Sequence, residues 1–378
     1  MQIGELNNPG KNVHLISHRE TIAATLSQIV NGKVVASSSQ ILQSDPNIII
    51  KAENSSKIKL KNKLAEPPKL TQLTSFKGHT RAFLKIQDGC DGYCSYCIIP
   101  KARSFVHSKP AEAVLQEAQA LVEAGHKEIV LTGIFLGAYG QKSVRRKNWA
   151  NQQNDKLAEL LDKMVEIPNL ARIRVSSLEP GDVTSRLLDS FCKHRKIMPH
   201  LHLSLQSGSN SVLKKMCRQY SADEFKEKLA LIKRRLDRPA ITADVIVGFP
   251  GETEADFEAT VDSAKEAGFA KIHVFSFSRR AGTVAAGLQD TVNNRVIKER
   301  SKILRDLDKK LGYKFRQQFV GKRDTILLEN RDGMACGRSE RYFMVCFENG
   351  FNLQKGELVK VKLVKNREDG MIGQIIRG

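Results

Sequence analysis

The sequence predicts an α/β protein with a parallel sheet, followed by a small β-barrel. From residue 81 onward, short apolar runs alternate with longer runs of helical periodicity, giving six strand–helix units. Near residue 320 the pattern changes to short strands separated by turns. The chain has 378 residues, enough for two or three domains.

The six predicted strands are short apolar runs, at 82–86, 128–132, 172–177, 200–205, 241–249 and 271–277. Helical patterns lie between or after them, at 110–124, 155–166, 183–193, 222–236, 253–267 and 294–319. This order predicts parallel strands joined by right-handed crossovers. Six units are two short of a closed eight-stranded barrel, so a partial, open barrel and a doubly wound sheet both fit.

The two ends of the chain differ from this middle part. Residues 13–31 look like one strand and one helix, and the lysine-rich stretch 51–69 contains Pro67 and Pro68, as in a polar linker. A solvated connector is favoured there over an RNA-facing arm. Beyond residue 320, Asp-Gly and Asn-Gly pairs at 332–333, 349–350 and 369–370 predict hairpin turns. A basic small barrel of this kind suits single-stranded RNA.

The charge of the chain points to a polyanionic partner. Lys and Arg number 61 against 41 Asp and Glu, a formal net charge of +20, which favours RNA or DNA over a membrane surface. A merely solvated basic surface is the plain alternative. No apolar run approaches the ~20 residues of a membrane-spanning helix. The N-terminus has no signal-peptide pattern, so we expect a cytoplasmic protein.

Three of the seven cysteines are crowded together directly after the first predicted strand. An odd number with this distribution does not indicate a disulfide framework. Cys90, Cys94 and Cys97 form a C-x3-C-x2-C run, and three thiolates on one loop can hold three irons of a 4Fe–4S cluster while the fourth iron stays open. Structural zinc normally takes four protein ligands at paired spacings, and no fourth cysteine is near. We therefore favour the cluster over zinc and over three unligated cysteines.

This spacing, with Tyr96 just before the third cysteine, resembles the radical S-adenosylmethionine (SAM) enzymes. In that superfamily the open iron chelates the amino and carboxylate groups of SAM. An electron from the reduced cluster then cleaves SAM to methionine and a 5′-deoxyadenosyl radical. The resemblance implies a partial (β/α)6 radical SAM barrel and places Tyr96 near the adenine of SAM.

Longer motifs narrow the resemblance to the tRNA and ribosomal methylthiotransferases. They include KIQDGC, CIIP, LTGIFLGAYG (131–140), RVSSLEP (174–180), HLHLSLQSGS (200–209) and DVIVGFPGET (244–253). Their wording is most similar to the branch that acts on threonylcarbamoyladenosine beside the tRNA anticodon. The C-terminal barrel resembles the TRAM domain, an RNA-binding module. The implied division is a remnant N-terminal methylthiotransferase domain at 1–50, a basic linker at 51–75, the partial barrel at 76–315 and the TRAM-like barrel at 316–378.

The resemblance also supplies candidate SAM contacts, because residues at the carboxyl ends of parallel strands face the active site. They are, in chain order, Tyr96, Thr132, Gly133, Ser177, Glu179, Gln206 and Arg218. Gly133 permits close backbone approach, the Glu179 carboxylate suits ribose hydroxyls or an ammonium, and the Arg218 guanidinium suits the SAM carboxylate. Each also has a plain alternative as a strand-end cap, a turn residue or a salt-bridge partner. His202 is expected to be an ordinary sheet histidine.

Full methylthiotransferases carry three more cysteines in an N-terminal domain that holds a second 4Fe–4S cluster, and here no cysteine precedes Cys90. The stretch NVHLISHRETIAATL resembles the end of that domain, so we expect a fragment or a form without the sulfur-donating cluster. The implied function is transfer of a 2-methylthio group to C2 of N6-threonylcarbamoyladenosine in the tRNA anticodon loop, with flavodoxin or ferredoxin as electron donor. The alternatives are a catalytically incomplete RNA-binding remnant and a methylthiotransferase acting on a ribosomal protein.

Overall fold

The computed structural model describes residues 70, 74, 78–149, 154–329, 334–347 and 353–376. Contacts within the chain divide it into two units, 1–68 and 69–378. The predicted remnant domain and nearly all of the predicted basic linker lie outside the described residues and stay predictions. Everything below concerns the second unit.

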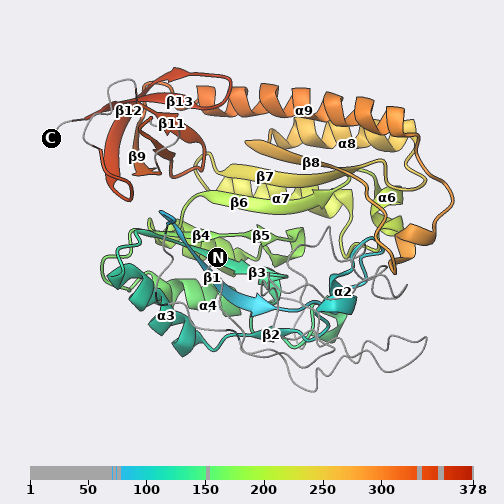
Figure 1. Ribbon diagram of the computed structural model, residues 1–378, viewed down its shortest axis with the longest axis horizontal. Coiled ribbons are helices and arrows are strands. Elements are labelled where there is room, and N and C mark those ends of the chain that lie inside the picture. The colour runs from blue at the N-terminus through green and yellow to red at the C-terminus, as the bar shows by residue number, and fades with distance from the viewer. Residues whose placement is uncertain are drawn as a thin grey trace, which may run out of the picture. The chain divides into compact units, whose positions relative to one another are not determined.

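Two four-stranded sheets form the centre of the second unit (Figure 1). The first has the order β2-β1-β3-β4, with β1 (Ala82–Asp88), β2 (His107–Ser108), β3 (Glu128–Gly133) and β4 (Arg172–Val175). The second has the order β5-β6-β7-β8, with β5 (Ser177–Leu178), β6 (His200–Gln206), β7 (Ala240–Val247) and β8 (Lys271–Ser276). All pairs are parallel except β1 with β2.

The six predicted strands lie where the apolar runs place them, with one difference, and the short antiparallel strand β2 was not predicted. The predicted third strand, 172–177, is divided: β4 pairs with β3, whereas β5 pairs with β6. Ser176 separates the two and belongs to neither strand. The parallel strands therefore form two half-sheets instead of one continuous ladder.

The six predicted helices are present in the predicted order, and the structure adds two short helices, α2 (Ile99–Ala102) and α6 (Asn210–Lys215), that were not predicted. In chain order, the predicted helices are α3 (Ala111–Glu123), α4 (Lys156–Met164), α5 (Ser185–Lys193), α7 (Ala222–Arg235), α8 (Glu254–Ala267) and α9 (Asn294–Gln317). Figure 1 shows α3 and α4 beside the first sheet and α7, α8 and α9 beside the second. Among the described residues, no helix combines the length and apolarity needed to cross a membrane.

Strand β6 shows how the sequence sets the two faces of a half-sheet. Successive side chains of a strand point to opposite faces. Leu201, Leu203 and Leu205 are fully buried in the main hydrophobic core. The alternate residues His200, His202 and Ser204 therefore lie on the other face of β6, so this second face is polar.

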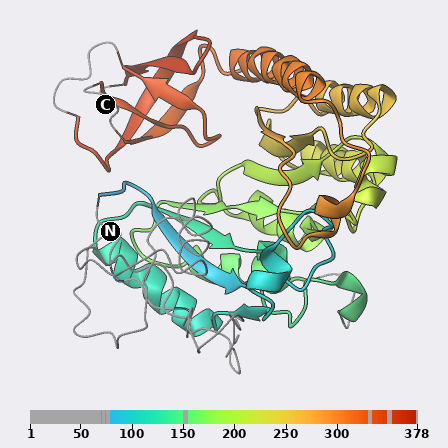
Figure 2. The same ribbon diagram turned by 45° about the vertical axis from the view of Figure 1, so that its right-hand side comes forward.

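The C-terminal region is a closed barrel with the strand order β10-β11-β13-β12-β9 (Figure 2, red). Its strands are β9 (Arg323–Leu328), β10 (Cys336–Arg338), β11 (Met344–Cys346), β12 (Leu358–Asn366) and β13 (Met371–Ile375). The predicted turn at 369–370 joins the antiparallel pair β12 and β13. The other two predicted turns lie outside the described residues.

One cysteine expectation was wrong in part. The scattered cysteines gave no sign of a disulfide, but Cys336 and Cys346 are bonded in the C-terminal barrel. They are directly opposite each other on the antiparallel strands β10 and β11. Ten residues separate them in the chain, so only the hairpin pairing, which the spacing does not reveal, brings them together.

The C-terminal barrel is attached at the amino ends of the half-sheet strands by a set of buried and half-buried charges. We call Arg81, Glu128, Arg172, Arg174, Glu329 and Arg338 the floor network. Glu128 is fully buried and pairs with Arg174 at 2.9 Å. Arg174 also donates to the Glu340 carbonyl oxygen at 3.1 Å, and Arg81 pairs with Glu329 at 2.7 Å. The floor network thus joins residues of the first half-sheet to residues of the C-terminal barrel.

Candidate active site

The cysteine loop begins where β1 ends and is held from several sides. Gly89 has φ +79°, and a Cβ there would lie 1.7 Å from the Phe105 carbonyl oxygen, so only glycine fits before Cys90. The Cys90 N–H donates to the Arg103 carbonyl oxygen at 2.8 Å. Ser95 donates through its N–H to the Met216 carbonyl oxygen at 3.0 Å. The loop is therefore a fixed platform.

The three loop cysteines are free thiols, and two of them receive hydrogen bonds at sulfur. The Gly92 N–H is 3.4 Å from Cys90 Sγ, and the Arg218 guanidinium donates to Cys94 Sγ at 3.0 Å. Burial raises the pKa of the Cys90 thiol to about 12 and also raises the pKa of Cys94. The Cys90 and Cys94 thiols therefore stay protonated until a bound metal ion displaces their protons.

Beside the cysteines lies a second buried group, the rim network, made of Arg146, Glu179, Asp182 and Arg218. Arg218 Nη2 is 2.5 Å from Glu179 Oε1, and its Nη1 also donates to the Tyr96 hydroxyl at 3.3 Å. One guanidinium thus contacts a sulfur, a phenol and a carboxylate. The nearby tyrosines, Glu179 and Cys94 hold the pKa of Arg218 well above its usual range despite its burial. Arg218 is a permanent cation at the edge of the cysteine loop.

The other half of the rim network fixes Glu179. Arg146 Nη2 lies 3.2 Å from Glu179 Oε2 and 2.7 Å from Asp182 Oδ1. Asp182 in turn accepts the Glu179 backbone N–H at 2.8 Å, and burial raises the pKa of Asp182 to about 6. A Cβ at Gly137 would lie 1.9 Å from the Asp182 carboxyl carbon, so this glycine makes room for the network. Both oxygens of Glu179 are engaged by arginines.

The structure brings together some of the predicted SAM contacts and separates others. Tyr96, Glu179 and Arg218 meet in one network with Cys94. Thr132 and Ser177 line a cavity between the half-sheets instead. Gly133 ends β3 and faces Gln87, whose side chain would be 3.0 Å from a Cβ at that position. Gln206 ends β6 with φ +63° and is buried. The SAM-binding role of each residue stays a prediction.

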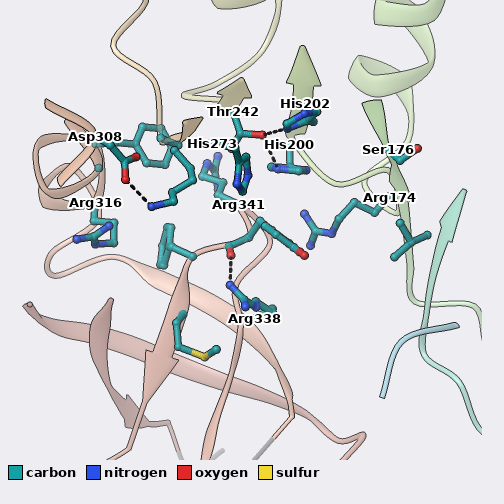
Figure 3. A pocket seen from close by; sticks show the side chains of 18 of the residues that line it. Arg174, Ser176, His200, His202, Thr242, His273, Asp308, Arg316, Arg338 and Arg341 are labelled. Atoms are coloured by element: carbon teal, nitrogen blue, oxygen red, sulfur yellow. Dashed lines mark hydrogen bonds and ion pairs between the residues drawn. The ribbon is translucent and has the colours of Figure 1, made fainter. Parts of the chain in front are cut away.

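Two parts of the site were missed in the sequence. Arg146 lies in a short 3-10 helix, Arg146–Asn148. This segment has no apolar periodicity from which a helix could be predicted. His200, His202 and His273 line the cavity between the half-sheets, together with Thr242 (Figure 3). The period-two alternation of 200–205 was the available signal, since it places His200 and His202 on the same face.

The cysteine set is suited to a cluster by its chemistry. Three free thiols on one loop, with N–H donors aimed at two sulfurs, match the thiolate ligands and sulfur hydrogen bonds of iron–sulfur sites. Within the described part of the chain, no three His, Cys, Asp or Glu side chains converge closely enough to hold a single metal ion.

Comparison with protein families first defines the class. Residues 84–264 match the model of the radical SAM superfamily, a range that runs from β1 into α8 and includes all three loop cysteines. This stretch is therefore a radical SAM domain.

Curated relatives then define the family. The chain is 39% identical over 308 residues to the threonylcarbamoyladenosine tRNA methylthiotransferase MtaB of Chlamydia pneumoniae, which covers 81% of this chain and 70% of that protein. It is 40% identical over 309 residues to MtaB of Bacillus subtilis, covering 80% of this chain and 66% of that protein. The chain belongs to this methylthiotransferase family and is an enzyme of the transferase type. It spans 66–70% of the length of these relatives.

Solved structures give weaker likenesses. Methylornithine synthase (PylB) aligns with a TM-score of 0.43 at 17% identity, over 62% of each chain. The methyltransferase TsrM from Kitasatospora setae, solved with cobalamin and a 4Fe–4S cluster, aligns with a TM-score of 0.44 at 15% identity, over 54% of this chain and 38% of TsrM.

Proposed function

We propose that this chain is the catalytic portion of a methylthiotransferase that modifies threonylcarbamoyladenosine in tRNA. The observation that carries the proposal is the cysteine loop beside the rim network, in a chain whose relatives are named for this reaction. In the proposal, Cys90, Cys94 and Cys97 hold three irons of one 4Fe–4S cluster within a partial (β/α)6 barrel. When bound, the cluster supplies the electron that cleaves SAM at the open iron.

The chain's own residues have distinct tasks in this proposal. Arg218 presents a fixed positive charge to the SAM carboxylate, and Glu179 and Arg146 hold Arg218 in place. Tyr96 packs near the adenine of SAM, and Thr132 and Ser177 contact SAM from the cavity wall. The C-terminal barrel is assigned as a TRAM-like RNA-binding module, and the net charge of +20 supports binding of the tRNA anticodon loop.

Anaerobic reconstitution with iron and sulfide tests the proposal. We expect about four irons per chain and release of 5′-deoxyadenosine when the protein is reduced with SAM present. We also expect tRNA affinity to fall steeply with salt, because phosphate contacts release counterions. A colourless, iron-free protein that still binds tRNA would identify a catalytically incomplete RNA-binding remnant instead. Preference for ribosomes over tRNA would redirect the proposal to a ribosomal protein.

A further inference from the structure

A cavity of about 660 Å3 opens between the two half-sheets and ends against the C-terminal barrel. Its lining runs from Thr132, near the carboxyl end of β3, past Arg174 within β4 to His200, the first residue of β6. The far wall comes from the C-terminal barrel and includes Arg338. The proposed SAM contacts account only for the end near Thr132 and Ser177, which we call the upper end. The opposite end, against the C-terminal barrel, is the lower end. The lower end has no part in the function described so far.

The lower end of the cavity is cationic. Seven arginine and lysine side chains line the cavity against three acidic ones. Arg174 is held by Glu128, and Arg338 is held by Glu329 at 3.3 Å and by the Tyr342 carbonyl oxygen at 3.1 Å. A guanidinium has five N–H donors, so these contacts leave Arg338 with donors to spare. Rigid, oriented cations of this kind suit a carboxylate or a phosphate.

The histidines add an unsatisfied polar atom to the same wall. Thr242 Oγ1 lies 2.8 Å from His202 Nδ1 and 3.4 Å from His200 Nε2 (Figure 3). His200 Nδ1 is buried and has no hydrogen-bond partner among the described residues. Burial and the nearby Arg174 keep the pKa of His200 well below its usual value, so this imidazole is neutral. Leaving a buried polar atom unpaired is costly, and a ligand with a hydroxyl or an N–H would remove that cost.

The spacing along the strands fits a short substituent on a base. Arg174 is opposite Val130, two residues before Thr132, so it lies roughly 7 Å further down the cavity. The threonylcarbamoyl group extends from adenine through roughly five bonds to its carboxylate, a comparable length. It also carries a hydroxyl and a ureido group, which match the neutral polar wall. An unmodified adenine has none of these groups.

We propose that Arg174, His200 and Arg338 form a specificity pocket that binds the carboxylate-bearing N6 substituent of the target adenosine. The inference rests on the proposed function and adds which residues of this chain distinguish a threonylcarbamoylated adenosine from a plain one. Arg338 is the residue to vary, because it is the last residue of β10 and its side chain is 28% exposed, whereas Arg174 is deeply buried.

The test is equilibrium binding of labelled anticodon stem-loops to the reconstituted protein. Three loops of one sequence differ at a single adenosine, which is threonylcarbamoylated, threonylcarbamoylated with its carboxylate methyl-esterified, or unmodified. We expect the first to bind about tenfold tighter than the third, an ordinary value for one charge-assisted contact, and the ester to lose most of that gain. Arg338→Gln should reduce the preference of that variant, measured as the ratio of its affinities for the first and third loops, to under about threefold. Arg186→Gln is the matched control, an arginine paired with Asp162 away from the cavity, and should keep the full preference.

A second variant guards against misfolding as an explanation. His200→Leu removes the unpaired Nδ1, so it should leave thermal stability equal or higher while lowering the preference. Equal binding of all three loops by the wild type would overturn the inference and leave the proposed function standing. The same holds if Arg338→Gln weakens all loops equally, since the pocket would then hold a backbone phosphate. Failure of every loop to bind would refute the proposed function, and the inference with it.

Discussion

The rim network and the floor network use the same chemistry at opposite ends of the strands. Each places arginines around a buried glutamate, Glu179 at the rim and Glu128 at the floor. The rim network reaches a cysteine sulfur through Arg218, whereas the floor network reaches backbone carbonyls of the C-terminal barrel through Arg172 and Arg174. Burial and pairing alone therefore do not reveal a role. The two networks differ in the groups that their arginines contact with their remaining N–H donors. A contact with a cysteine sulfur indicates a reactive site, and contacts with backbone carbonyls of another domain indicate a domain junction.

The largest expected effect concerns the group that the rim network contacts. Cys94→Ala should reduce iron from about four per chain to under one and abolish SAM cleavage, because three thiolates are the minimum ligand set for an open cluster. Iron and sulfide analysis after anaerobic reconstitution measures this. Cys192→Ala is the control, since that cysteine is free and exposed. Full iron content in the Cys94 variant would show that the ligand assignment is wrong.

The next effect separates the rim network from the cluster itself. Arg218→Gln should lower SAM cleavage about 10- to 100-fold while iron content stays normal, because charge-assisted contacts of about 1.5–3 kcal/mol are lost. The assay is 5′-deoxyadenosine release over a range of SAM concentrations. Arg186→Gln again serves as control, since its arginine is paired but distant from the loop. Unchanged SAM cleavage in the Arg218 variant would reduce the rim network to a structural role.

The floor network should respond in stability and not in chemistry. Glu128→Gln leaves Arg174 and Arg172 without their buried carboxylate, so the free energy of unfolding should fall by about 3–5 kcal/mol. Denaturant unfolding measures it, with SAM cleavage at low temperature as the second readout. Glu159→Gln, in an exposed pair with Lys156, should change stability by under about 0.5 kcal/mol. If Glu128→Gln lost SAM cleavage while its stability stayed unchanged, the floor network would act in catalysis as the rim network does.

The sequence predicted the strands, most helices and the cysteine loop well, because these depend on local periodicity and spacing. Strand β6 could be placed from its alternating leucines, and the loop with Cys90, Cys94 and Cys97 from a run of eight residues. The networks could not be predicted in this way. Arg146 and Glu179, or Arg81 and Glu329, meet only because distant segments pack together, and nothing in the local sequence encodes that pairing. The same reason hid the Cys336–Cys346 bond.

The smallest expected effect is a pH-dependent change in stability at Asp324, in strand β9 of the C-terminal barrel. Burial raises the pKa of Asp324 from 3.8 to about 6, so the folded chain binds this proton more tightly than the unfolded chain. Its ionisation therefore costs stability as the pH rises through about 6. Asp324→Asn should stabilise the protein by about 1–3 kcal/mol at pH 8, and the gain should vanish below the ordinary pKa of 3.8. Thermal unfolding of both proteins at several pH values checks the sign, and a gain that does not depend on pH would contradict it.

The central claim is that the cysteine loop leaves one iron open for SAM. Electron paramagnetic resonance of the reduced, reconstituted protein, recorded before and after SAM is added, tests it most directly. We predict a 4Fe–4S signal whose shape changes on SAM addition in the wild type, with a weaker change in Arg218→Gln. A signal that SAM leaves unaltered, or a protein that takes up zinc in place of iron, would contradict the claim.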